Sequence, residues 1–426
     1  MSMNTAEAAG ARISRAQIQI QTETPDMNDH SDRNAVAPLA ALLDQAREVG
    51  EFAYSHRERA ENDRRMSDAV VDKLRATGLM KLCRHRKWGG AEADPMTFLD
   101  VGREIARGSA SLGWIYSVLG FHDWYMGFTS QELQRDVWGK DPDAFVCDSF
   151  APVGQIERVA DGYVLSGQWR FASGIEWSSW IGVGGIAVAP DGEHPEHLLF
   201  FIPREEVSVV DDWKTMGLKG TASRAVGVDK VFVPAHRAFA LGRLAGPGGR
   251  EAVVDDGPLW RTSLTTMQGL AILTPSVGIA QRVVEEFGIW TKARIRPYEQ
   301  GAAAREAPAP QLALAASATQ WDASWSLAQK YAQEGWDRAL RGESWVLSEE
   351  ERARYFAWRG YIARSSIELS DQLYIGSGAM ALFDSHPLQQ LFRDIHATGV
   401  HIGVDRADAY TSRGRVAMGF PGHAFH

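Results

Sequence analysis

Hydrophobic residues recur at three- and four-residue spacing along the first third of the chain. The segments "AVAPLAALLDQAREVGEFAYSHRERAENDRR" and "MSDAVVDKLRATGLMKL" place them on a charged background, which is typical of amphipathic helices. In "DPMTFLDVGREIARGSASLGWIYSVLGFHDWYMGF", Asp94 and Pro95 match the N-cap and the first position of a helix. We therefore expect an N-terminal helical domain over residues 36–142. The polar residues 1–35 before it are expected to be disordered.

The middle of the chain changes to a two-residue period. "GQIERVADGYVLSGQWRFASG" alternates on both sides of Asp161-Gly162, which predicts a β-hairpin. "SWIGVGGIAVA", "EHLLFFIP" and "AVGVDKVFVPAHRAF" are apolar runs of strand length separated by turn residues. We expect a small antiparallel β domain over residues 143–250.

The helical period returns after Pro258. Four long amphipathic segments follow one another to the end of the chain, the last being "PLQQLFRDIHATGVHIGVDRADAYTSRGRVAMG". Four such helices in a row predict a helical bundle, here over residues 251–426. The fold class is therefore α+β and mostly α, in the order helices, sheet, bundle.

Composition narrows the possible partners. The 426 residues are 45% hydrophobic and 23% charged, with a net charge of −9, and this acidity argues against nucleic acid or an anionic membrane as partner. Cys83 and Cys147 lie far apart and form no CxxC motif, so we expect no disulfide framework and no metal site. No apolar run is long enough to cross a bilayer. A cytoplasmic location is the expectation.

Tryptophan is the outlier, with 15 in the chain. "WRFASGIEWSSW", from Trp169 to Trp180, holds three of them together with a phenylalanine and Ser173-Gly174. Indoles near glycines and hydroxyls suit a large flat ligand with a polar edge. The alternative is ordinary core, with Ser173-Gly174 ending a strand in a turn.

The order of motifs resembles the acyl-CoA dehydrogenase superfamily over about residues 39–419. The likeness is carried by "LRATGLMKLCRHRKWGG", "CDSFAPVGQIERVADGYVLSGQWRFASG", "FVPAHRAF" and "GSGAMALFDSHPLQQLFRDIHA". The last of these contains an Arg-Asp pair typical of the superfamily. The resemblance implies a helical domain, a middle β domain and a C-terminal four-helix bundle.

Two chemistries compete within this superfamily. A dehydrogenase with tightly bound FAD usually takes its base from a C-terminal "EGT" sequence, but after "LFRDIHATGVHIGVD" the chain offers His396, His401 and Asp405 instead. "WIYSVLGFHDWYMGF", "KDPDAFVCDSFAP" and "LWRTS" resemble the oxygenase components of two-component flavin monooxygenases, such as those acting on p-hydroxyphenylacetate and on phenolic secosteroids. A third possibility is a non-catalytic scaffold or flavin carrier.

The oxygenase resemblance implies a set of reactants. FMNH₂ or FADH₂ would come from a separate flavin reductase and react with O₂. The resulting C4a-hydroperoxyflavin would oxygenate a phenol, an indole or a polycyclic aromatic. A homotetramer is also implied. No GxGxxG motif follows a predicted strand, so a nicotinamide site is not expected.

The resemblance also assigns residues to the flavin. Ser173 would lie near the flavin N5, with Trp169 and Phe171 sharing one face of the same strand. For Ser149 the alternative is a cap or loop hydroxyl, and for the arginines it is a surface ion pair. The candidate flavin-binding residues are Ser149, Trp169, Phe171 and Ser173 for the ring, and Arg261, Thr221 and Ser223 for the phosphate, with Arg294 and Arg296 as further phosphate candidates.

Activation of a phenol or indole calls for a group that moves a proton, and histidine suits this best. His401, His122 and His396 are candidates in that order. On a helix, Asp405 would share the face of His401 and orient its imidazole. Phe121, Trp124, Trp177 and Tyr116 are expected to line the substrate cavity. This set has no cation for a carboxylate, which favours a larger or neutral aromatic.

Overall fold

The computed structural model describes residues 37–246, 257–296 and 299–422. The polar stretch 1–35, predicted to be disordered, lies outside the described residues. The helices are α1 (Leu39–Ser55), α2 (Arg57–Asp63), α3 (Asp68–Ala76), α4 (Pro95–Gly108), α5 (Ala110–Met126), α6 (Gln131–Trp138), α7 (Gly242–Ala245), α8 (Leu264–Ala293), α9 (Pro308–Leu340), α10 (Glu349–Ser377), α11 (Pro387–Thr398) and α12 (Arg406–Ala417).

Strands β1 to β8 lie between the two groups of helices in the sequence, and the short strands β9 and β10 lie between α8 and α9. They are β1 (Val146–Ser149), β2 (Gln155–Val159), β3 (Gly162–Ala172), β4 (Trp180–Val188), β5 (Pro195–Pro203), β6 (Ser208–Val210), β7 (Arg224–Pro234), β8 (Ala238–Ala240), β9 (Ile295–Arg296) and β10 (Ala302–Ala303). Three 3-10 turns are used below: η4 (Lys219–Thr221), η6 (Pro258–Arg261) and η10 (Ile402–Val404). The predicted order of helices, strands and helices is confirmed.

The boundary between α4 and α5 follows from its capping residues. The Asp94 carboxylate accepts a hydrogen bond from the Thr97 amide at 2.9 Å, and Pro95 occupies the first turn of α4. Ser109 is extended and its hydroxyl accepts from the Leu112 amide, which starts α5. Both features satisfy amides that a helix N-terminus leaves without partners.

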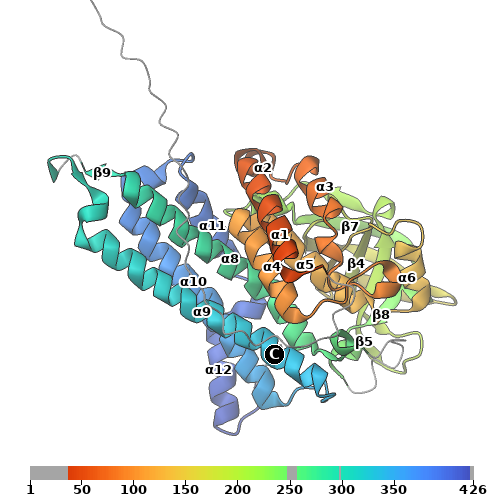
Figure 1. The fold of residues 1–426 in the computed structure, drawn as a ribbon. Coiled ribbons are helices and arrows are strands. Elements are labelled where there is room, and N and C mark those ends of the chain that lie inside the picture. Colours follow the sequence, from red (N-terminus) through yellow and green to blue (C-terminus); the bar gives the residue numbers. More distant parts are fainter. Residues whose placement is uncertain (1–36, 247–256, 297–298, 423–426) are drawn as a thin grey trace, which may run out of the picture. The chain divides into compact units, whose positions relative to one another are not determined.

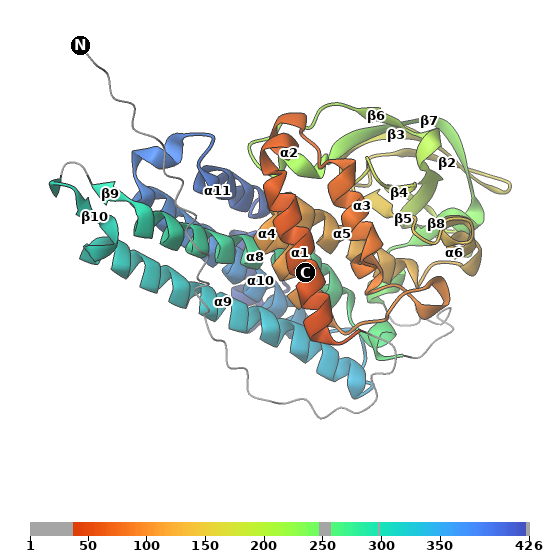
Figure 2. The same ribbon diagram turned by 45° about the horizontal axis from the view of Figure 1, so that its top comes forward.

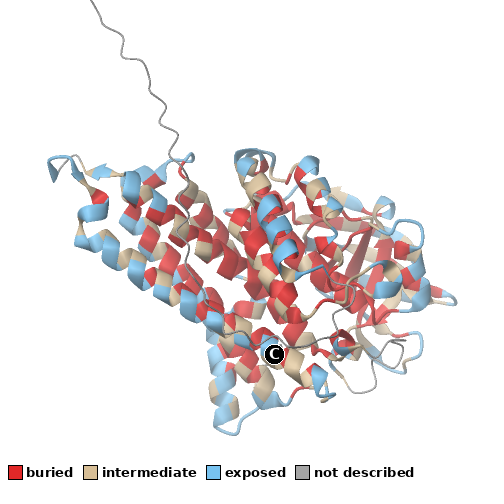
Figure 3. Cartoon of the chain, in the orientation of Figure 1, coloured by how far each residue is buried: buried red, intermediate tan, exposed pale blue. Residues whose placement is uncertain are grey.

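Helix α5 is buried on all sides. Nearly all of its residues are shielded from solvent, including those with polar side chains. It packs against α4, α8, β1 and η4, and the views place α4 and α5 between the long helices and the strands (Figures 1 and 2). The colouring by burial shows the same concentration of buried residues there (Figure 3). A helix that is apolar all round belongs in the centre of a protein.

The strands form two four-stranded sheets, in the orders β1-β4-β5-β8 and β2-β3-β7-β6. The predicted hairpin is confirmed as β2 and β3. The turn predicted at Asp161-Gly162 is wrong by one residue, because Val159 lies opposite Gly162 and the turn is Ala160-Asp161. The pair β1 and β4 is parallel, whereas the other pairs in both sheets are antiparallel. The Trp169 indole of β3 donates to the Gly184 carbonyl of β4 at 2.8 Å, which links the two sheets.

The helices α8, α9 and α10 pack side by side as predicted (Figure 1). The prediction of a single fourth helix over residues 387–419 is wrong, because the structure has two helices there, α11 and α12. The first ends at Gly399, and the Asp405 carboxylate caps the second by accepting from the Asp408 amide at 3.0 Å. His401 lies between them in extended backbone and begins η10.

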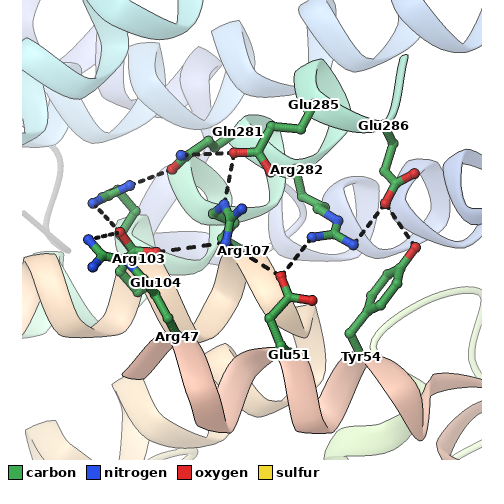
Figure 4. A network of polar contacts seen from close by, with 10 residues as sticks. All are labelled: Arg47, Glu51, Tyr54, Arg103, Glu104, Arg107, Gln281, Arg282, Glu285 and Glu286. Atoms are coloured by element: carbon green, nitrogen blue, oxygen red, sulfur yellow. Dashed lines mark hydrogen bonds and ion pairs between the residues drawn. The ribbon is translucent and has the colours of Figure 1, made fainter. Parts of the chain in front are cut away.

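A network of ten side chains fastens α1 and α4 to α8 (Figure 4). Buried Arg282 pairs with Glu286 at 2.8 Å and with Glu51 at 3.1 Å, and Tyr54 donates to Glu286. Such pairs cost desolvation energy, but breaking one leaves a buried charge uncompensated. The network therefore specifies how these helices pack. Among the described residues, no helix has the length and apolar character needed to cross a membrane.

Candidate active site

Three of the predicted flavin contacts form a chain of hydroxyls next to α5. The Ser173 Oγ lies 2.7 Å from the Ser223 Oγ, which lies 2.7 Å from the Thr221 Oγ1. The Thr221 hydroxyl then lies 2.8 Å from the carbonyl oxygen of Leu218. Ser223 and Thr221 are buried. The structure thus brings together residues that are about 50 positions apart in the sequence.

The direction of this hydroxyl chain follows from its end. A carbonyl oxygen only accepts, so the Thr221 hydroxyl must donate its single proton to Leu218. Ser223 must then donate to Thr221, and Ser173 must donate to Ser223. The Ser173 oxygen also accepts from the Trp114 indole N–H at 3.1 Å. The Ser173 hydroxyl therefore keeps one lone pair, and it can only accept a hydrogen bond from a ligand.

His401 lies next to the same tryptophan. The ring centroids of Trp114 and His401 are 5.9 Å apart. The Nδ1 of His401 accepts a hydrogen bond from the Gly403 amide at 3.0 Å, so the neutral ring carries its proton on Nε2. Burial, with Arg359 as the second cause, lowers the pKa of His401 to about 4. At neutral pH this imidazole is therefore uncharged and offers an N–H donor.

His122 belongs to a second polar cluster, two turns further along α5, or about 12 Å by helix geometry. Its Nδ1 contacts the Val146 carbonyl at 2.8 Å and its Nε2 lies 2.8 Å from the Asp148 carboxylate. Tyr125 donates to the same carboxylate oxygen at 2.8 Å. Because the carbonyl only accepts, Nδ1 carries a proton, and a second proton lies between Nε2 and Asp148. His122 and Asp148 are buried.

Aromatic rings surround the His122 cluster. Phe121 stacks on Trp124 with ring centroids 5.9 Å apart, and Phe150 contacts both Phe121 and His122 edge to face. Phe121 and Trp124 therefore lie together, as predicted for a cavity wall. Whether they contact a substrate stays a prediction.

Trp169 and Phe171 do not share a face, and that expectation is wrong. Trp169 is fully buried between the sheets, whereas Phe171 is 68% exposed. The register of β3 shifts between Trp169 and Ala172, and Phe171 has φ +65°. An irregularity of this kind turns the following side chain away from the expected face. Strand alternation therefore holds as far as Trp169 and fails after it.

Two of the predicted cavity residues have partners elsewhere. The Trp177 indole donates to Asp68 at the start of α3 at 3.2 Å. Tyr116 is fully buried against Phe98 between α4 and α5, with ring centroids 5.2 Å apart.

His396, the third histidine candidate, and Asp405, expected on the helical face of His401, both have other partners. His396 has both ring nitrogens engaged, one by the Phe392 carbonyl at 2.7 Å and the other by Asp371 at 3.1 Å. Asp405 caps α12, so the expected contact on a shared helical face with His401 is wrong because η10 interrupts the helix.

The remaining polar residues predicted to contact the flavin edge or its phosphate lie in different elements of the structure. The Ser149 hydroxyl donates to the Arg170 carbonyl at 2.7 Å, joining β1 to β3. Arg294 donates to the carbonyl oxygens of Gly376 and Ser377 at the end of α10. Arg296 pairs with Glu299. Arg261 ends η6, and its proposed phosphate contact stays a prediction.

Sequence reasoning missed four residues of the site. Trp114 and Tyr125 lie on α5 as part of an apolar run, and Asp148 lies one residue before a predicted contact. Asp394 belongs to the Arg-Asp pair noted above. The signal that could have pointed to such residues is chemical, because a histidine that moves a proton generally needs a group that orients it.

Comparison with known proteins agrees with this geometry. Models of the N-terminal and C-terminal domains of acyl-CoA dehydrogenase match residues 39–138 and 270–406. The flavin-dependent monooxygenase oxygenase subunit HsaA of Rhodococcus jostii is 34% identical, covering 86% of this chain and 96% of that protein. The p-hydroxyphenylacetate 3-hydroxylase oxygenase component of Acinetobacter baumannii is 27% identical, covering 94% and 92%.

A solved structure supports the same assignment. The HsaA monooxygenase from M. tuberculosis superposes with a TM-score of 0.83 at 29% identity, covering 91% of this chain and 99% of that one. The expected resemblance is confirmed, and these relatives favour the oxygenase over the dehydrogenase alternative. The chain belongs to the family of oxygenase components of flavin-dependent monooxygenases and has the acyl-CoA dehydrogenase fold.

Proposed function

We propose that the protein hydroxylates a neutral phenol, or a related ring with an O–H or N–H group, using reduced flavin and O₂. The main observation in support of this proposal is that two polar sites lie along the same helix, α5. One presents the Ser173 acceptor beside Trp114 and His401. The other holds His122 and Asp148 among aromatic rings.

The residues at the first site fit a flavin. Reduced flavin has a ring N–H, at N5, that oxidised flavin lacks, and Ser173 retains an acceptor lone pair for such a group. The Trp114 ring provides an apolar neighbour. Ser173, with Ser223 and Thr221 behind it, would hold the flavin edge, and Arg261 would meet its phosphate. When bound, reduced flavin would supply the electrons that activate O₂.

The two histidines would have different roles. His401, neutral with its proton on Nε2, would donate a hydrogen bond at the reacting end of the site. Both ring nitrogens of His122 are engaged, so it would act through Asp148, with which it shares a proton, and the Asp148 carboxylate would polarise or deprotonate the ring hydroxyl of the substrate. The electron-rich ring that results is the better nucleophile, which is the reason that hydroxylation needs such a group. This division makes the pair of His122 and Asp148, rather than His401, our choice for the acid–base group.

The substrate would be bound mainly by aromatic surface. Phe121, Trp124 and Phe150 surround His122 and have no charge with which to select a carboxylate. We propose a phenol, an indole or a fused polycycle without an anionic group. The dehydrogenase alternative lacks a specific observation in its favour, because the C-terminal region presents His401 in place of an expected glutamate.

The assembly of the protein and its cellular location are also proposals. We propose a homotetramer in the cytoplasm that receives flavin from a separate reductase, with the three-domain division given above. Large apolar side chains near the end of α10, including Ile375, Leu382 and Phe383, are more than half exposed, and a second copy would cover them. Light scattering on the purified protein tests the assembly.

The test of the function is a reconstituted reaction. The protein is mixed with any flavin reductase, NADH, FMN or FAD, and a panel of phenols, indoles and polycyclic aromatics under ¹⁸O₂. We expect a product with one ¹⁸O atom from at least one neutral ring, formed only when both flavin and the protein are present. Bleaching of a protein-bound flavin by an acyl-CoA thioester, with no oxygenated product, would contradict the proposal.

A further inference from the structure

The Arg-Asp pair of the sequence motif connects α11 to the loop that ends the hydroxyl chain. The Asp394 carboxylate accepts a hydrogen bond from the Leu218 amide at 2.6 Å, and the pair spans 176 positions. Arg393 donates to the Met216 carbonyl at 2.7 Å. A side chain at Gly217 would come within 2.2 Å of the Arg393 carbonyl, so only glycine permits this approach.

The loop held by these contacts has a disfavoured backbone. Leu218 has φ +52° and Ala222 has φ +46°, the left-handed region that residues with a Cβ adopt at a cost. Such conformations persist where surrounding contacts determine them. The contact from Asp394 acts directly on the first of the two residues. Without it, the peptide of Leu218 would be free to relax towards ordinary values.

The carbonyl of the same residue, which lies in the next peptide, Leu218–Lys219, determines the proton order of the hydroxyl chain. The Leu218 carbonyl accepts from the Thr221 hydroxyl at 2.8 Å and from the Trp213 indole at 3.1 Å. Rotation of this peptide would remove the acceptor on which the order depends. The Thr221 proton would then be free to point at Ser223, and the order could reverse, leaving Ser173 as a donor.

We infer that Asp394 is a positioning residue that fixes the direction of the hydroxyl chain and thereby makes the site prefer reduced over oxidised flavin. The inference rests on the proposed function for its ligand. An outward acceptor at Ser173 matches the N5–H of reduced flavin and opposes the N5 lone pair of oxidised flavin. A reversed chain would present a proton and favour the oxidised form.

The charged surroundings of Asp394 are consistent with a structural anchor. Glu61 of α2 pairs with both Arg393 at 2.5 Å and Lys219 at 2.7 Å, so the two nearby cations already have an acidic partner. Asp394 is 3% exposed. Its polar contact is the Leu218 amide, and an uncharged oxygen in the same place would accept that hydrogen bond. This predicts that asparagine can replace Asp394 and alanine cannot.

The experiment uses the full-length protein with Asp394→Ala, Asp394→Asn and the control Asp384→Ala, an exposed acid just before α11. Hydrogen exchange without flavin reports on the amides of residues 216–223. Anaerobic titrations with FMNH₂ and with FMN give two dissociation constants and their ratio. We expect faster exchange and about a tenfold loss of preference for FMNH₂ in Asp394→Ala, on the scale of one hydrogen bond. Asp394→Asn and Asp384→Ala should resemble the wild type.

A second pair of variants tests the chain itself. Thr221→Val removes the hydroxyl that contacts Leu218, and Thr221→Ser keeps it. We expect Thr221→Val to lose the preference for FMNH₂ while its exchange at residue 218 stays slow. Unchanged exchange in Asp394→Ala, or an unchanged ratio in both Asp394→Ala and Thr221→Val, would overturn the inference. A wild-type protein that binds neither flavin form would instead overturn the proposed function, and the exchange result would still stand.

Discussion

The indole N–H of Trp114 donates to the hydroxyl oxygen of Ser173 at 3.1 Å. This bond joins the buried helix α5 to the end of β3, and so connects the helical and the β parts of the site. It also occupies one of the two lone pairs of Ser173. With the proton of Ser173 directed at Ser223, the bond leaves one acceptor position for a ligand.

Replacing Trp114 by phenylalanine should weaken the binding of reduced flavin by about two- to tenfold, the usual net effect of one hydrogen bond. The change removes the donor to Ser173 and keeps an aromatic ring against His401. Anaerobic titration with FMNH₂ measures it. Trp177→Phe is the matched control, because that indole donates to Asp68 instead. Equal losses in both variants would contradict a specific role for Trp114.

His401 should act without titrating between pH 6 and 8, because its pKa is lowered to about 4. His401→Ala should increase the share of reduced flavin whose oxidation yields H₂O₂ instead of product. His401→Gln should restore part of the coupling, since its amide can donate a hydrogen bond. The measurement is the product-to-H₂O₂ ratio across this pH range. A coupling that titrates near pH 6.5 and loses that titration in His401→Gln would show that His401 changes charge during function.

The fold could be predicted from the sequence because its signals are local. The amphipathic period of α1, the caps at Asp94 and Ser109, and the turn before Gly162 each depend on neighbouring residues. The break between α11 and α12 was missed because the amphipathic period continues across it, while the Asp405 cap that starts α12 resembles an ordinary helical acid.

The site could be predicted only in part, because its contacts are distant in the sequence. Ser173 was found by resemblance, and Thr221 and Ser223 as hydroxyls beside glycines that suit a phosphate. In the structure Ser223 contacts both Ser173 and Thr221. Phe171 was misplaced because a register shift in β3 is invisible to a rule of alternation. Asp148 was missed because its partner His122 comes from another element, so no spacing links the two.

Asp148→Asn should lower turnover by about ten- to a hundredfold, in the lower range for loss of acid–base assistance. The neutral amide no longer balances the proton that lies between Asp148 and His122. Tyr125→Phe removes one hydrogen bond to the same oxygen and should lower turnover only a few fold. Steady-state rates with a saturating aromatic substrate measure both. Wild-type turnover in a folded Asp148→Asn protein would remove His122 from the proposed role.

Asp394→Asn should change how stability depends on pH. Burial raises the pKa of Asp394 to about 7, against about 4 for an aspartate in an unfolded chain. Between these values the folded protein holds a proton that the unfolded chain has released, so the stability that this group contributes is present at low pH and lost as the pH rises through 7. Asparagine does not titrate and still accepts from Leu218. The variant should therefore match the wild type near pH 4 and become increasingly more stable than it as the pH rises to 7 and 8.

The measurement is the difference in Tm between Asp394→Asn and the wild type at pH 5, 6, 7 and 8. The difference should grow with pH, because only the wild type must keep a buried carboxylate charged at pH 8. Asp384→Asn, at an exposed position, should give a flat difference. A flat difference for Asp394→Asn as well would mean that Asp394 titrates at its ordinary pKa, and that its neighbours Arg393 and Lys219 offset the cost of its burial.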